Sequence, residues 1–192
     1  MITSDALVGE DDVGVTVSEL DEAWAQALAA AAQRAYAAGR GDVAEYLRLR
    51  TSNDLLRQTS IEWLLATFTA LAGQANREGA SLQLVAEDGH RFRVGHSTMV
   101  GRLLKLSFGV RSISIEAGWP RAPHDGFIRG GGLAWARISH RGKSLMNQEL
   151  LLEKSAQDSP RWVVRQPEVR PRRFLEADVK HHLTKLLSDN YT

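Results

Sequence analysis

The spacing of apolar residues predicts helices in the first part of the chain. Residues 18–38 hold ten alanines, and the apolar positions recur at steps of three and four until Gly39. A second helix is expected from Asp42, with a break at the Thr-Ser-Asn of 51–53 and a third helical segment to about Asn76. The third segment has a clear apolar stripe formed by Ile61, Leu64, Leu65, Phe68, Leu71, Ala72 and Ala75.

After Gly79 the period changes to two, which is typical of strands. Asp88-Gly89 lies between SLQLVAE and HRFRVG and predicts a hairpin turn there. Residues 97–106 favour a short helix, with a strand as the alternative, and VRSISIEAGW alternates as a half-buried strand. Further strands are expected in LAWARIS, in SLMNQELLLEK and at 161–165, followed by an amphipathic helix at 175–187.

The fold class that follows is α+β. We expect N-terminal helices, then an antiparallel sheet of about five to six strands with one short inserted helix, and a C-terminal amphipathic helix. The chain divides into an acidic flexible tail at 1–17, a helical segment at 18–79 and a sheet region at 80–192, the last two forming one compact unit. Several sensory and scaffold folds share this order of elements, but no motif assigns the chain to a family.

Trp63 lies almost opposite the apolar stripe, on a side shared with Ala66 and Ala70. A large apolar side chain in that position needs a second surface, either the preceding helix or another subunit. The alanine-rich helix that carries Trp24 allows close approach from several sides, although alanine is also simply the best helix former. These four residues are the candidate interface of a homo-oligomer.

The composition of the chain excludes several classes of site and indicates where in the cell the protein is expected. The 192 residues include no cysteine, which excludes disulfides, thiolate zinc sites and iron–sulfur clusters. No apolar run reaches the ~18–20 residues of a membrane span, and the acidic N-terminus lacks the pattern of a secretory signal. We therefore expect a cytoplasmic protein without a membrane association, and the alanine, glycine and arginine content is typical of a bacterial, GC-rich genome.

The net charge of +1 hides an asymmetry along the chain. Residues 1–89 sum to −8, and residues 90–173 sum to +10. Such a distribution favours contact between the two parts, within one chain or between subunits, or an anionic partner such as nucleic acid or an acidic protein. The candidate anion-binding residues in the strands and in the extended segment after them are Arg91, Arg93, Arg161, Arg165, Arg170, Arg172 and Arg173. Aromatic residues do not alternate with these arginines, and no nucleic-acid-binding motif is present.

The stretch FIRGGGLAWARISHRGKS at 127–144 resembles phosphate-binding loops only in part. A P-loop requires glycine where Arg137 stands, and a dinucleotide fingerprint requires glycine where Trp135 stands. Arg129 with Gly130, Gly131 and Gly132 can still form an anion-binding nest, or the glycines can serve as a flexible strand entry.

Histidines supply the remaining chemical candidates. His124-Asp125 has the composition of a base with its orienting carboxylate, but Pro-His-Asp-Gly is also good turn chemistry, and His140 stands in a similar turn. His181 and His182 are adjacent on a helix and diverge by about 100°, so they cannot form a ligand pair. We expect neither a metal nor a cofactor.

The interpretation that fits these patterns best is a non-enzymatic interaction or regulatory module with a basic surface, self-associating through its N-terminal helices. One alternative is a binder of nucleic acid or another polyanion. Another is a small enzyme acting on an anionic or phosphorylated substrate, with His124, Asp125, His140 and Arg129 as candidates.

Overall fold

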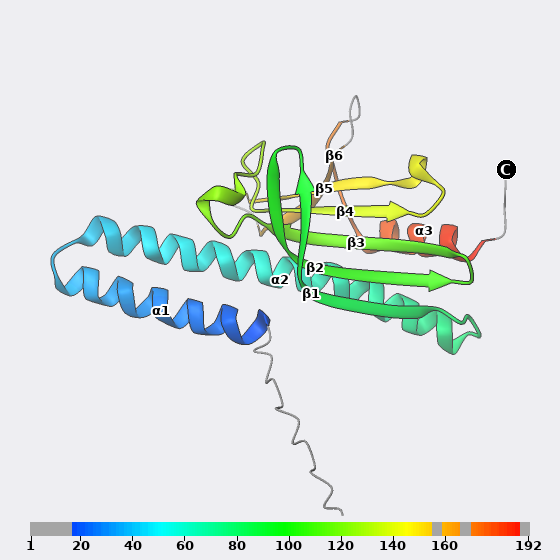
Figure 1. Cartoon of the computed structure of the whole chain (residues 1–192), viewed down its shortest axis with the longest axis horizontal. Helices are drawn as coiled ribbons and strands as arrows, with labels where there is room; N and C mark the ends of the chain where they lie inside the picture. The colour runs from blue at the N-terminus through cyan, green and yellow to red at the C-terminus, as the bar shows by residue number, and fades with distance from the viewer. Residues whose placement is uncertain (1–16, 155–158, 166–169, 189–192) are drawn as a thin grey trace, which may run out of the picture.

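The computed structural model describes residues 17–154, 159–165 and 170–188, with side chains from residue 22 onward. Two helices, α1 (Val17–Ala37) and α2 (Gly41–Arg77), form an antiparallel pair. A sheet of seven antiparallel strands follows, and α3 (Glu176–Leu187) ends the fold (Figure 1). The α+β prediction is confirmed, with seven strands in place of five to six. The tail expected at 1–17 lies outside the described residues, except that Val17 begins α1.

The sheet is a meander, in which each strand pairs with the next one along the chain. The strands are β1 (Gln83–Val94), β2 (Ser97–Phe108), β3 (Arg111–Trp119), β4 (Ala134–His140), β5 (Gln148–Glu153), β6 (Arg161–Arg165) and β7 (Arg172–Arg173). Two short 3₁₀ turns, η1 (Pro123–Asp125) and η2 (Ser144–Met146), lie in the loops on either side of β4.

The hydrophobic core lies between one face of this sheet and the helices α2 and α3. The second half of α2 contributes Ile61, Leu64, Leu65, Phe68 and Ala72, and α3 contributes Val179, Leu183 and Leu186. The other face is not covered by these helices and is called the open face below. Most of the stripe predicted for 61–75 is therefore confirmed as the part of α2 that packs on the sheet.

The break expected at residues 51–53 is wrong, because α2 is continuous. Thr51 keeps its hydroxyl within the helix by donating a hydrogen bond to the carbonyl of Leu47 at 3.0 Å. Threonine, serine and asparagine are poor helix formers but cost only a few tenths of a kcal/mol each (~0.5), which neighbouring turns outweigh. The continuous helix matters because its first half, paired with α1, projects beyond the sheet (Figure 1).

The turn predicted at Asp88-Gly89 is also wrong. Gly89 takes φ +70° inside β1, where the pairing with β2 shifts by one residue, and the hairpin turn falls at Gly95 and His96. An extra residue of this kind is a β-bulge, and glycine suits it for the same reason that it suits a turn. The bulge reverses the alternation of β1: Leu84 faces the helices, whereas His90 and Phe92 turn to the open face.

The short helix predicted at 97–106 is strand β2. Leu104 and Leu106 are buried in the core while Lys105 between them is exposed, so the period is two. The sequence misled because Met99, Val100, Leu103 and Leu104 also fit a helical step. Gly101 of β2 pairs with Gly118 of β3, and a Cβ added at Gly118 would lie 2.7 Å from the carbonyl oxygen of Val100. The two backbones approach so closely that neither position accepts a side chain.

The helical pair extends past the sheet as a projecting arm (Figure 1). We define the arm as residues 22–57, that is, α1 with the first half of α2. Its described helices bury only Leu28, Ala32 and Ala44 against each other. Leu28 is thus the single buried side chain larger than alanine among the described residues of the arm.

Candidate protein-interaction surface

The arm exposes large apolar side chains along its whole length. Tyr46 is 62% exposed, Leu49 is 55% exposed and Trp24 is 49% exposed. Tyr36 and Leu55 are more than half exposed as well. Scattered apolar residues are normal on a protein surface, but five such side chains on a helical pair with so small a core form an unusual concentration.

Two of the exposed residues continue a stripe that is used for packing elsewhere on the same helix. Tyr46, Leu49 and Leu56 follow one another at steps of three and seven, and so share one side of α2. Leu56 packs against the core, and Ser60 four residues later accepts a hydrogen bond from Trp162 Nε1 at 3.0 Å. The apolar stripe of α2 therefore continues from the protein body onto the arm.

The candidate interface residues lie where the sequence suggested, on the outside of the helices. Trp63 is 42% exposed, and Ala66 and Ala70 are exposed beside it. Trp24 is partly covered by the Arg50 guanidinium, which lies 5.5 Å from its ring centre. Both tryptophans therefore keep much of their surface exposed in the single chain.

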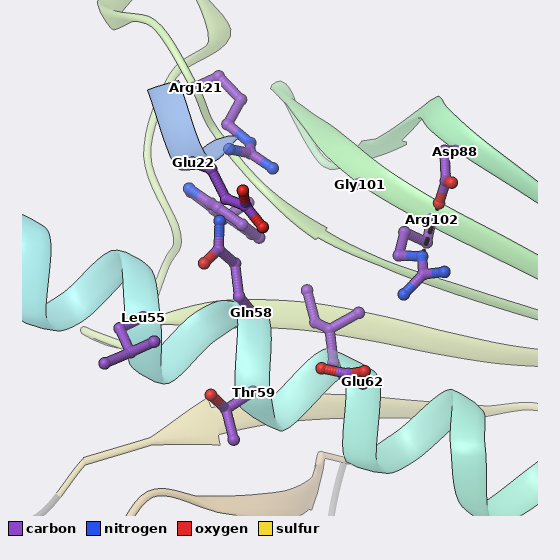
Figure 2. Close-up of a pocket in the computed structure, with 11 residues that line it drawn as sticks. Glu22, Leu55, Gln58, Thr59, Glu62, Asp88, Gly101, Arg102 and Arg121 are labelled. Carbon is purple, nitrogen blue, oxygen red and sulfur yellow. Dashed lines mark hydrogen bonds and ion pairs between the residues drawn. The ribbon is translucent and has the colours of Figure 1, made fainter. Parts of the chain in front are cut away.

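A cavity of about 400 Å³ lies where the arm joins the sheet (Figure 2). Glu22 of α1 and Gln58 and Glu62 of α2 line one side of it. The other side holds Arg102, paired with Asp88 at 2.6 Å, and Arg121, whose guanidinium lies 3.5 Å from the ring centre of Trp119. Acidic groups on the helical side thus face basic groups on the sheet side, which favours neither an anion nor a cation.

The open face carries a row of opposite charges across successive strands. His90 Nε2 lies 2.8 Å from Glu116, and the same carboxylate accepts two hydrogen bonds from Arg137, at 2.6 and 2.8 Å. Glu149 stands opposite Arg137 on one side and opposite Arg165 on the other, and Arg165 pairs with Glu153 at 3.2 Å. Cross-strand pairs of opposite charge stabilise a sheet, so this row has a structural explanation.

The predicted anion-binding arginines do not gather on one surface. Arg161 and Arg165 alternate with core residues of β6 and so face the open side, whereas Arg91 and Arg93 alternate with His90 and Phe92, which face that side themselves. Carboxylates of the same chain pair with several of these arginines: Arg91 with Asp125 at 2.9 Å and Arg172 with Asp178 at 2.7 Å. Other members of the predicted set, Arg93, Arg129, Arg170 and Arg173, are exposed.

The glycine loop at 130–132 rests on the sheet. Gly130 and Gly131 take φ of +85° and +73°, and a Cβ added at Gly132 would lie 2.2 Å from the Leu151 side chain. Leu133 then donates a backbone hydrogen bond to Leu152 at 2.7 Å, which aligns β4 with β5. Glycine is thus required here for close packing and a left-handed backbone, the strand-entry interpretation of the sequence.

The His124-Asp125 pair does not form a base with its orienting carboxylate. His124 is 79% exposed, and its Nε2 lies 3.7 Å from Asp125, beyond a hydrogen bond. Asp125 is buried and accepts the backbone N–H of Ala122 at 3.0 Å and that of Arg121 at 3.2 Å. Burial raises the pKa of Asp125, but these hydrogen bonds and the nearby Arg91 and His124 outweigh it, so the pKa is lowered overall. Asp125 is an ionised anchor for its loop.

His140 and His182 form a buried pair that sequence reasoning did not connect. His140 Nε2 lies 2.8 Å from His182 Nδ1, and His182 Nε2 lies 3.2 Å from the Gln148 side-chain oxygen. When both rings are neutral, His182 Nε2–H donates to Gln148 and His182 Nδ1 accepts a hydrogen bond from His140 Nε2–H. Burial lowers the pKa of each histidine to about 4. The signal in the sequence was the position of His182 among the apolar residues of its helix.

Metal and membrane chemistry find no support in the described residues. No group of three or more histidines, aspartates and glutamates there is arranged to hold a metal ion. No helix within the same residues combines the length and the apolar character needed to cross a bilayer.

No family model matches the chain, and no curated protein or solved structure matches it either.

Proposed function

We propose that the protein is a non-enzymatic interaction module that self-associates through its N-terminal helices. The observation that carries this proposal is the projecting arm, in which Trp24, Tyr36, Tyr46, Leu49 and Leu55 are exposed around an interior of one leucine and two alanines. Burial of a leucine or an aromatic side chain contributes about 1.5–3 kcal/mol, so an isolated helical pair with one enclosed leucine is weakly held.

A second protein surface would cover the exposed apolar side chains of the arm and so supply the packing that its small interior lacks. Helices with an apolar stripe are stabilised mainly by packing that stripe against another element. Within the described chain, the sheet provides that element for the second half of α2, and in the arm only the last turn, with Leu56 and Arg57, contacts the body. Binding of two arms to each other would bury the exposed residues and complete a four-helix core.

Two single-residue substitutions test the proposal. Leu49→Glu and Tyr46→Glu each place a charge on the exposed stripe, and Leu145→Glu is the matched control, because Leu145 is 96% exposed in a loop beyond β4. We expect light scattering to give an oligomer for the unaltered protein and for Leu145→Glu, and a lower mass for the two arm variants. A monomeric unaltered protein at micromolar concentration would contradict the proposal.

The two alternatives receive less support from the geometry. Polyanion binding through Arg91, Arg165 or Arg172 would have to displace the carboxylates that pair with these three arginines. Catalysis by the predicted candidates would need Asp125 or His140, and both are buried in structural hydrogen bonds.

A further inference from the structure

The cavity between the arm and the sheet has two walls of different charge (Figure 2). The helical wall carries the carboxylates of Glu22 from α1 and Glu62 from α2, and no basic residue lines it. The sheet wall carries Arg102 from β2 and Arg121 from the segment after β3, together with Asp88 of β1. A ligand in this cavity therefore contacts carboxylates on one side and guanidinium groups on the other.

Both walls keep hydrogen-bonding groups that the described chain does not use. Asp88 accepts a hydrogen bond from Nε of Arg102 at 2.6 Å, which leaves the two terminal nitrogens of that guanidinium for another acceptor. Figure 2 shows this end of Arg102 directed toward α2. On the helical wall, the side chains of Glu62 and Gln58 have no hydrogen-bond partner among the described residues. The cavity thus offers an acceptor for a cation and a donor fork for a carboxylate.

The size and the apolar lining of the cavity restrict the ligand further. Its volume of about 400 Å³ is at the lower end of the range for small-molecule sites, which is about 300–1,000 Å³. Leu55, Ile61 and Trp119 supply the apolar part of the lining. Small-molecule sites typically combine such apolar surface with a few placed polar groups, so the lining fits a small molecule with an apolar part and two opposite charges.

We propose that this cavity binds a free amino acid with an apolar side chain. The ammonium group of the ligand contacts Glu62, its carboxylate contacts the terminal nitrogens of Arg102, and its side chain packs against Leu55 and Trp119. A ligand with a single charge would leave one charged wall without a partner, whereas a zwitterion satisfies both walls. The site lies within one chain, so this proposal does not depend on self-association through the arm.

Calorimetric titration of the unaltered protein with leucine, methionine and phenylalanine, each up to about 10 mM, tests the ligand class. The N-acetyl derivative of each amino acid lacks the ammonium group, and the amide derivative lacks the carboxylate. We expect at least one free amino acid to bind and neither of its derivatives to bind measurably. If none of the three amino acids binds, or if a derivative binds as tightly as its parent, the proposal is wrong.

Substitutions on the two walls test the position of the site. Glu62→Gln and Arg102→Gln each remove one charge, and each should raise the dissociation constant of the bound amino acid about tenfold or more. The matched controls are Glu78→Gln, just after α2, and Arg93→Gln on β1, because both residues are exposed and lie outside the cavity. Circular dichroism checks that all four variants keep the fold. Unchanged binding by the two cavity variants, or equal losses in the controls, would overturn the assignment of the site.

Discussion

Both halves of α2 carry large apolar side chains, but the two halves have different surroundings. In the second half, Ile61, Leu64 and Phe68 are at most 2% exposed because the sheet and α3 cover them. In the first half, Ala44 alone is buried, and Tyr46, Leu49 and Leu55 are largely exposed. The apolar side chains of one helix are therefore buried where the sheet and α3 cover them, and exposed where no other part of the described chain does.

The apolar residues of the arm are exposed because no other part of the single chain covers them, and not because their spacing differs from that of the body. The same step along the helix, continued from Leu49 to Leu56, passes from a side chain that is 55% exposed to one packed against the core. Residues with a similar pattern should respond differently to substitution: those in the body should control folding, and those in the arm should control association.

The largest expected effect belongs to the body. Phe68→Ala removes a side chain with no exposed surface, and we expect it to lower the free energy of unfolding by about 3–5 kcal/mol. Leu49→Ala on the same helix should change the unfolding of the monomer by less than about 1 kcal/mol. Urea denaturation at a concentration where the protein is monomeric measures both. Equal losses for the two variants would remove the distinction between arm and body.

Acid should weaken the body through the buried histidine pair. The pKa values of His140 and His182 are lowered to about 4 from the usual 6.5, so between these values the unfolded chain binds more protons than the folded one. The contribution of the pair to stability is therefore complete above pH 6.5 and is lost progressively as the pH decreases from 6.5 toward 4.

Denaturation at several pH values between 7.5 and 4.5 measures this slope. The double variant His140→Gln with His182→Gln should lose most of the histidine contribution, whatever its stability at neutral pH. The matched control is His124→Gln, which changes an exposed histidine and should keep the slope of the unaltered protein. A slope that is the same in all three proteins would show that the pair is not responsible.

Trp63→Glu tests whether the interface extends to the boundary between the arm and the body. Trp63 is 42% exposed on the side of α2 that does not face the core. If a second copy covers it, the substitution should weaken association by about 2 kcal/mol, roughly 30-fold in the dissociation constant. Sedimentation gives the dissociation constant, and circular dichroism should show an intact fold. Loss of the fold, or unchanged association, would place Trp63 outside the interface.

The smallest effect concerns the charge asymmetry. Deletion of residues 2–16 removes Asp5, Glu10, Asp11 and Asp12, which raises the net charge from +1 to +5. We expect the truncated protein to bind heparin or DNA more tightly at low salt, with the gain vanishing as salt rises. Replacing Arg170, Arg172 and Arg173 with serine in the truncated protein should cancel much of that gain. Identical polyanion binding before and after truncation would mean that the asymmetry is compositional.

The sequence predicted the class of the fold because periodicity reports which face of an element is buried. The stripe at 61–75 and the alternation at 111–119 were interpreted correctly on that basis. The failures occurred where one local signal fits two structures. Asp88-Gly89 suits a bulge as well as a turn, and Met99, Val100, Leu103 and Leu104 satisfy a helical step by coincidence. Only the register of β2 between its neighbours decides these cases.

The candidate interface was predictable in part. Trp63 stood out because it lies opposite a recognisable stripe, so a single helix revealed the need for a second surface. The exposure of Tyr46 and Leu49 was not predictable, because it depends on α2 running on past the sheet edge. The pairing of His140 with His182 was out of reach for the same reason: β4 and α3 are distant in the chain and meet only in the folded core.

Hydrogen exchange followed at different protein concentrations tests whether a second copy of the chain covers the arm. If a second copy covers the arm, amides of α1 should exchange more slowly as the protein concentration rises from about 0.1 to about 100 μM, because association stabilises the bound form by mass action. Amides of α2 around Phe68 should be equally protected throughout, since the sheet of the same chain covers them. Equal protection of α1 at all concentrations would contradict the account.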